Sequence, residues 1–142
     1  MLKGIPKILP PELLKILDEM GHTDELTIGD GNFPGETYGK RIIRMDGHSM
    51  PDILDAILRP FPLDTYMEHP VALMQVVPDD PVKTPIWDTY KEIVRKYDSR
   101  GDACFEEIEK WEFYQCTREK SYVVIMSYAN IILKKGVVTD AD

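Results

Sequence analysis

The chain has 142 residues, of which 43% are hydrophobic and 30% charged, and its formal net charge is −8. This length and balance predict a single folded domain over residues 1–142, because disordered chains have lower hydrophobicity. The excess of acidic residues argues against nucleic acids and anionic membranes as partners, since phosphate binding depends on clustered lysine and arginine. No stretch approaches the roughly 18 consecutive apolar residues of a membrane-spanning helix.

The first part of the chain predicts a helix followed by a strand. Residues 11–20 form an amphipathic pattern with proline in the first turn and a glycine directly after it, which is typical of a short helix. Residues 25–29 predict a strand, and the loop 30–35 contains too much glycine and proline to continue as a helix. His22 and Asp30 therefore lie on either side of one strand.

The remaining elements continue this alternation. Strands are expected over residues 41–45, 70–77, 108–111, 122–126 and 130–133, and helices over residues 51–58, 87–97 and 113–120. Residues 78–85 are rich in proline and predict a loop, and residues 99–103 predict a turn. Repeated alternation of strand and helix predicts an α/β fold in three layers, with helices flanking a mixed, largely parallel sheet.

Cofactor motifs are absent from the sequence, so no cofactor is expected. The glycines of residues 29–35 do not have the spacing of a dinucleotide-binding turn, and Pro34 stands where a phosphate-binding helix would start. His48 and His69 have no carboxylates at metal-ligand spacing, so no metal is expected. Cys104 and Cys116 fit neither a disulfide framework nor a zinc cluster, which makes the reducing cytoplasm the simplest setting.

Two residues at the ends of the first predicted strand are candidates for chemistry. His22 lies in a polar turn, and Asp24 is close enough in sequence to orient its ring. Asp30 follows the strand at its C-terminal end, where ligands bind in open α/β sheets. Spacing alone favours a surface histidine for His22, because single histidines in loops are common, and it fits Asp30 equally well as the carboxylate of a turn.

Two later stretches carry polar groups that could contact a ligand. Lys110 lies where charged and aromatic residues alternate, a pattern typical of a solvated strand face. Tyr128, Ala129 and Asn130 precede an apolar run and place a hydroxyl and an amide at the start of a strand. On these residues alone, ordinary turn chemistry explains the second stretch as well.

Five segments carry a resemblance to a known family. They are residues 21–25, 30–34, 43–47, 113–114 and 128–136. Their order and spacing resemble the L-fucose mutarotase and D-ribose pyranase family over nearly the whole chain. Residues 1–4, 11–14 and 63–66 are more similar to its fucose branch.

The resemblance implies roles for the candidate residues. His22 corresponds to the general acid of the family and Asp30 to a substrate-binding carboxylate, while residues 128–130 correspond to the segment that contacts the sugar. Lys110 stands where related fucose mutarotases often carry arginine, and it keeps the cation but loses the planar pair of donors. Only Ser127 separates the predicted strand 122–126 from Tyr128, whereas relatives have a longer loop there.

The implied function is that of an isomerase that interconverts the α and β anomers of L-fucose, and by extension the pyranose and furanose forms of D-ribose. Ring opening needs one proton delivered to the ring oxygen and one removed from the anomeric hydroxyl, so a positioned acid or base suffices. A D-ribose pyranase, a non-catalytic monosaccharide-binding module and an aldose–ketose isomerase are the alternatives. The family also implies a homo-oligomer, for which a decamer is one precedent.

Overall fold

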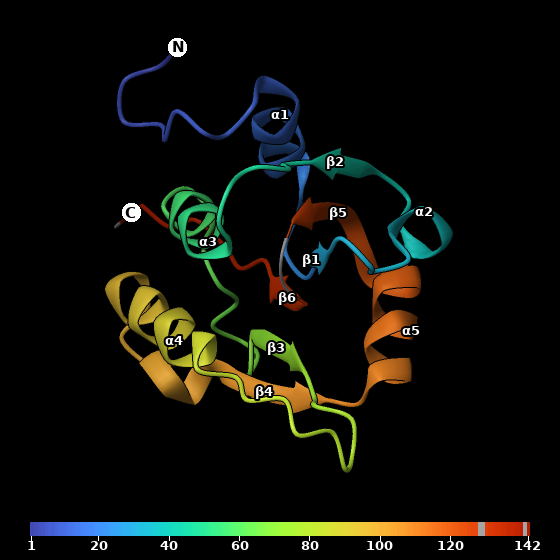
Figure 1. Cartoon of the computed structure of the whole chain (residues 1–142). Coiled ribbons are helices and arrows are strands. Elements are labelled where there is room, and N and C mark those ends of the chain that lie inside the picture. Colours follow the sequence, from blue (N-terminus) through green and yellow to red (C-terminus); the bar gives the residue numbers. More distant parts are fainter. Residues whose placement is uncertain (128–129, 141) are drawn as a thin grey trace.

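The computed structural model describes residues 1–127, 130–140 and 142. Within these residues, six strands form one sheet in the order β2-β5-β1-β6-β3-β4 (Figure 1). The strands are β1 (Glu25–Asp30), β2 (Ile42–Arg44), β3 (Val71–Met74), β4 (Phe105–Ile108), β5 (Ser121–Ser127) and β6 (Ile131–Lys134). The helices are α1 (Pro11–Glu19), α2 (Gly35–Tyr38), α3 (Met50–Leu58), α4 (Ile86–Tyr97) and α5 (Lys110–Lys120), with a 3₁₀ turn, η1 (Gly101–Cys104).

The direction of the strands defines two edges of the sheet. β1 pairs in parallel with β5, as do β2 with β5 and β3 with β4. β6 runs antiparallel to both of its neighbours, β1 and β3. The strands β1, β2, β3, β4 and β5 therefore all run in one direction, and β6 runs in the other. The edge of the sheet at which these five strands end and β6 begins is called the carboxyl edge below, and the opposite edge is called the amino edge.

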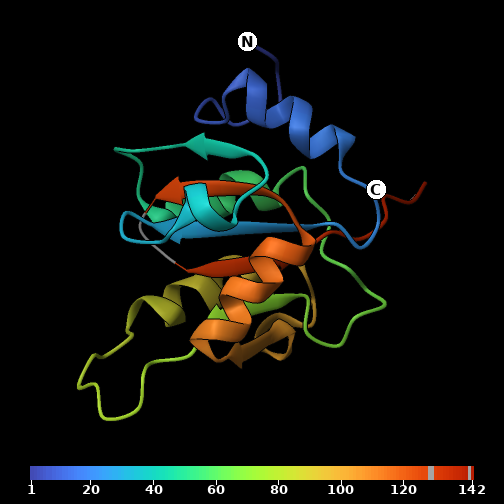
Figure 2. The same cartoon turned by 90° about the vertical axis from the view of Figure 1, so that its right-hand side faces the viewer.

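Helices cover both faces of the sheet, which confirms the predicted three-layer α/β fold with a mixed, largely parallel sheet (Figures 1 and 2). α1, α3 and α4 bury their apolar sides in one core cluster together with Leu26 and Ile28 of β1. α5 closes the other face, where Phe113 packs with Phe33 and Val124. β1 is therefore covered on both sides, as expected for a central strand of a largely parallel sheet.

Most predicted elements are confirmed, but the region around Lys110 was predicted wrongly. The fourth strand ends at Ile108, and Lys110 is the first residue of α5. The carboxylate of Glu109 caps this helix, because it accepts hydrogen bonds from the backbone N–H groups of Trp111 and Glu112 at 2.9 and 3.1 Å. The short helix α2 was also not anticipated, and β3 ends at Met74, earlier than predicted.

Candidate functional site

Asp30 and Asn130 meet at the carboxyl edge, where β1 ends and β6 begins. The side-chain amide of Asn130 donates to Oδ2 of Asp30 at 3.1 Å, and its oxygen accepts from the backbone N–H of Asp30 at 3.2 Å. The backbone N–H of Asn32 donates to the other carboxylate oxygen at 2.8 Å. These bonds fix a half-buried carboxylate and amide side by side, where they can accept and donate hydrogen bonds. Tyr128 and Ala129 lie outside the described residues.

Lys110 lies at the same edge, since it follows β4. Its Nζ atom lies 5.3 Å from the ring centre of Trp111 and 5.7 Å from that of Tyr114. Burial raises the pKa of the Tyr114 hydroxyl, and the negative charge of Asp30 raises it further. A cavity of about 190 Å³ lies beside Lys110 and Trp111. The carboxyl edge thus offers a carboxylate, an amide, an ammonium group and aromatic rings.

His22 lies at the other end of β1, at the amino edge. Its Nε2 atom lies 3.1 Å from Oδ1 of Asp64, whose side chain is only 1% exposed, while the imidazole is 37% exposed. The ring centre of Tyr66 lies 5.1 Å from that of His22. The carboxylate of Asp24 instead accepts from the backbone N–H of Gly21 at 2.7 Å. The ring is therefore oriented by Asp64, which corrects the expectation that Asp24 does so.

Asp64 received no role from the sequence, although residues 63–66 contribute to the family resemblance. It is separated from His22 by 42 positions, and no spacing rule connects a loop after α3 with a turn before β1. The only signal in the sequence was an aspartate that follows the apolar residues Phe61 and Leu63, both of which are buried in the structure.

The two groups of candidate residues do not meet within one chain. Five residue steps separate Glu25 from Asp30 along β1, which is about 17 Å at the rise of an extended strand. His22 lies a further three residues before Glu25. The structure brings together Asp30 and Asn130, with Lys110 at the same edge, and leaves His22 and Asp64 at the opposite one.

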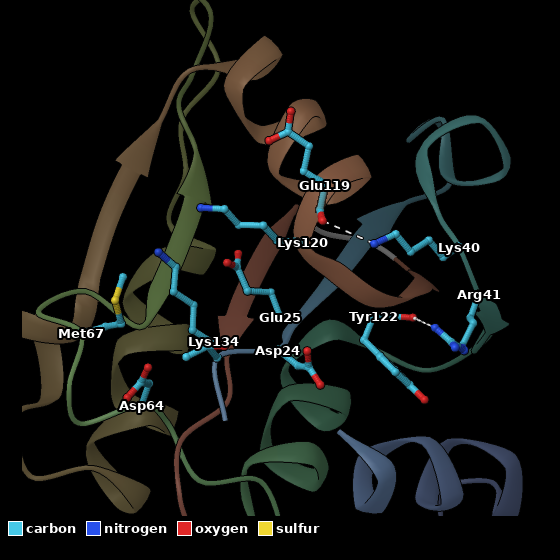
Figure 3. Close-up of a pocket in the computed structure, with 11 residues that line it drawn as sticks. Asp24, Glu25, Lys40, Arg41, Asp64, Met67, Glu119, Lys120, Tyr122 and Lys134 are labelled. Carbon is cyan, nitrogen blue, oxygen red and sulfur yellow. Dashed lines mark hydrogen bonds between the residues drawn. The ribbon is translucent and has the colours of Figure 1, made fainter. Parts of the chain in front are cut away.

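A cavity of about 660 Å³ opens at the amino edge (Figure 3). Its centre is Glu25, which is 5% exposed and whose carboxylate points between Lys120 and Lys134. Burial raises the pKa of Glu25, and the nearby charge of Lys134 opposes this effect. Asp64 lines the same cavity, so the cavity adjoins the His22 pair.

No metal centre is found in the part of the chain that the structure describes, since no three His, Cys, Asp or Glu side chains gather there closely enough to hold an ion. Within the same residues, no helix has the length and apolar character needed to cross a membrane.

Comparisons with known proteins agree on one family. The model of the RbsD / FucU transport protein family matches residues 3–138. A fucose mutarotase from Mus musculus is 44% identical over 95% of this chain and 94% of its own length. The crystal structure of FucU from Bifidobacterium longum has a TM-score of 0.93 and 53% identity, covering 96% of this chain and 100% of that one. A fucose mutarotase from Streptococcus pneumoniae, solved in complex with L-fucose, has a TM-score of 0.88 and 38% identity over 97% of this chain and 100% of its own.

Proposed function

The chain belongs to the RbsD / FucU transport protein family, and from this we propose that it is a sugar mutarotase acting on L-fucose, with one catalytic domain over residues 1–142. The enzyme opens the pyranose ring at the anomeric carbon and closes it again on either face, which interconverts the α and β anomers. The observation that carries this proposal is the likeness, over 97% of the chain, to a fucose mutarotase that binds L-fucose.

The chemistry requires few groups, and the candidate residues supply them. His22 donates the proton to the ring oxygen, because an imidazole can give and recover a proton near neutral pH. Asp30 accepts hydrogen bonds from the sugar hydroxyls, and Asn130 both accepts and donates them. Lys110 adds a cationic donor. Tyr128 and Ala129 complete the sugar-binding segment. No cofactor takes part in the proposed reaction.

We also propose that a complete site forms between two copies of the chain. Since His22 and Asp30 lie at opposite edges of the sheet, a sugar bound at the carboxyl edge of one subunit can reach a His22 only if a neighbour presents its amino edge. Such a contact joins two different surfaces, and its repetition gives a ring when the rotation between neighbouring subunits closes. A homo-oligomer, of which a decamer is one form, therefore accounts for the separation of the site residues.

The proposed setting is the cytoplasm, with the monosaccharide as the ligand and no nucleic acid or membrane as partner. The free thiols of Cys104 and Cys116 support a reducing compartment. The net charge of −8 makes binding to phosphate-rich surfaces unfavourable.

Exchange spectroscopy by NMR tests the proposed activity. Adding the protein to L-fucose at anomeric equilibrium should increase the cross-peaks between the α and β anomers. Replacing His22 with Ala should slow the catalysed exchange by about 10²- to 10⁴-fold, the usual contribution of one acid or base. His69→Ala serves as the control, since that ring bonds to the carbonyl of Ala103 away from β1.

Each alternative function has its own outcome in this experiment. Formation of a ketose would identify an aldose–ketose isomerase, and saturable binding without faster exchange would identify a binding module. Either result would rule out the mutarotase.

A further inference from the structure

The buried carboxylate of Asp64 faces the imidazole of His22. One oxygen, Oδ1, accepts hydrogen bonds from Nε2–H of His22 at 3.1 Å and from the backbone N–H of Tyr66 at 2.9 Å. A carboxylate that is 1% exposed needs such partners, because an unpaired buried charge is strongly unfavourable. A carboxylate can only accept, so the nitrogen that faces it carries the hydrogen and the lone pair of the neutral ring is on Nδ1.

The end of β6 fixes the backbone near both His22 and Asp64, although these two residues are far apart in the sequence. The backbone N–H of Thr23 donates to the carbonyl of Lys135 at 3.0 Å, and the N–H of Lys135 donates to the carbonyl of Asp24 at 2.8 Å. The N–H of Asp64 donates to the carbonyl of Lys134 at 3.0 Å. Consecutive residues of one strand end therefore fix the turn that carries His22 and the loop that carries Asp64.

Arg100 fixes the Asp64 loop from its other side. Its guanidinium donates to the carbonyl of Asp64 at 3.0 Å and to that of Met67 at 2.9 Å. The same guanidinium is paired with Asp98 at 2.8 Å. Because Arg100 bonds the backbone, the carboxylate of Asp64 stays free to accept from the ring. These backbone contacts hold the imidazole of His22 in one orientation, and they do not depend on a bound sugar.

We propose that Asp64 is a positioning residue, which holds His22 by Nε2 so that Nδ1 is the atom that transfers the proton to and from the sugar. The proposal rests on the proposed mutarotase function and adds to it the atom that reacts and the group that aims it. Asp64 does not touch the sugar and acts through His22.

The Asp64→Asn variant tests this role, since it keeps the size of the side chain and removes its charge. The exchange rate constant kcat should fall about 10- to 100-fold, by analogy with carboxylates that orient metal-binding histidines, while KM changes less than about threefold. Glu68→Gln is the matched control, because Glu68 is an exposed carboxyl in the same loop that lies 3.8 Å from a different histidine, His69. The control should exchange anomers at the wild-type rate.

A double-mutant cycle separates positioning from a general structural role. If Asp64 acts through His22, adding Asp64→Asn to His22→Ala should leave the residual rate within about twofold, because the two effects are coupled. A further 10-fold loss in the double variant, or an unchanged kcat in Asp64→Asn alone, would overturn the proposal.

The hydrogen-bonded ring proton gives a readout that needs no substrate. In the ligand-free protein, the Nε2–H proton of His22 should give a downfield resonance protected from exchange, absent in His22→Ala and shifted upfield in Asp64→Asn. Its absence from the wild type would contradict the positioning role even if the enzyme is active. An inactive wild type that shows this resonance would instead contradict the proposed function.

Discussion

The residue after His22 has an unusual backbone conformation. Thr23 has a φ of 76°, in the left-handed region that β-branched side chains rarely adopt. The hydrogen bond from its N–H to Lys135 holds it there. Such strain persists where surrounding contacts determine the conformation, and it often accompanies functional turns. The turn that carries His22 is therefore strained at the residue directly after it.

Replacing Thr23 with Gly should raise the free energy of unfolding by up to about 1 kcal/mol, because glycine adopts this φ without strain but loses more backbone entropy on folding. Urea denaturation at a fixed protein concentration measures the change. Thr23→Ala keeps a Cβ atom and should bring no comparable gain. A glycine variant that is less stable than the wild type would show that Thr23 is not strained.

The buried carboxyl group of Glu25 should make the stability of the protein depend on pH. Burial raises its pKa above the usual 4.5. Between 4.5 and this raised value the folded chain binds more protons than the unfolded chain, so stability falls as the pH rises through that window. Glu25→Gln should therefore be more stable than the wild type at pH 7, and the difference should shrink toward pH 4.

Denaturation curves at both pH values test the prediction for Glu25. Glu107→Gln, at an exposed site on β4, is the control and should show a difference that hardly changes with pH. A Glu25→Gln variant that is less stable than the wild type at pH 7 would mean that the charges of Lys134 and Lys120 stabilise the carboxylate by more than burial destabilises it.

At the scale of elements, the end of β6 is packed closely against the loop that carries Asp64. A Cβ atom at Gly136 would lie 2.5 Å from the carbonyl oxygen of Leu63 and 2.9 Å from Cα of Asp64. These are backbone atoms, which cannot rotate away. The close approach explains why glycine follows the two lysines that end the strand.

Gly136→Ala should lower the free energy of unfolding by about 1–3 kcal/mol, the usual effect of overpacking. It should also lower the exchange rate, because the displaced loop carries Asp64. Gly31→Ala is the control, since nothing lies within 4 Å of a Cβ atom there and the change should be nearly neutral. Equal stability of the two variants, measured by urea denaturation, would refute the tight packing.

The sequence predicted elements well where the pattern was local, as for α1, β1 and α4, whose apolar periodicity decides their type. It failed at Lys110, because the alternation of charged and aromatic residues outweighed the capping signal of Glu109. The site was predictable in part. Asp30 and Asn130 do meet, but their pairing with each other, like that of His22 with Asp64, depends on the order of strands in the sheet.

At the scale of the whole molecule, the separation of His22 from Asp30 makes the proposed activity a property of the assembly. In the assembly proposed above, one subunit contributes the acid and its neighbour contributes the sugar-binding groups. Two variants that are each inactive can then complement one another, because each retains the half that the other lacks.

Mixed oligomers of His22→Ala and Asp30→Asn chains should recover about one quarter of the wild-type exchange rate when the chains assemble at random in equal amounts. Co-expression with two affinity tags gives such assemblies, and NMR exchange measures the rate. Each variant assembled alone is the control and should remain inactive. No recovery in assemblies shown to contain both chains would mean that His22 and Asp30 do not act at the same site.

The position of β6 affects how the chain folds as it is synthesised. β6 lies between β1 and β3 in the sheet, yet it follows all the other strands in the chain. Without residues 131–134 no strand joins β2-β5-β1 to β3-β4, so the facing sides of β1 and β3 have no strand to pair with. Open strand edges pair readily with other chains, so a chain in which β6 has not yet joined the sheet should be the form most prone to aggregate.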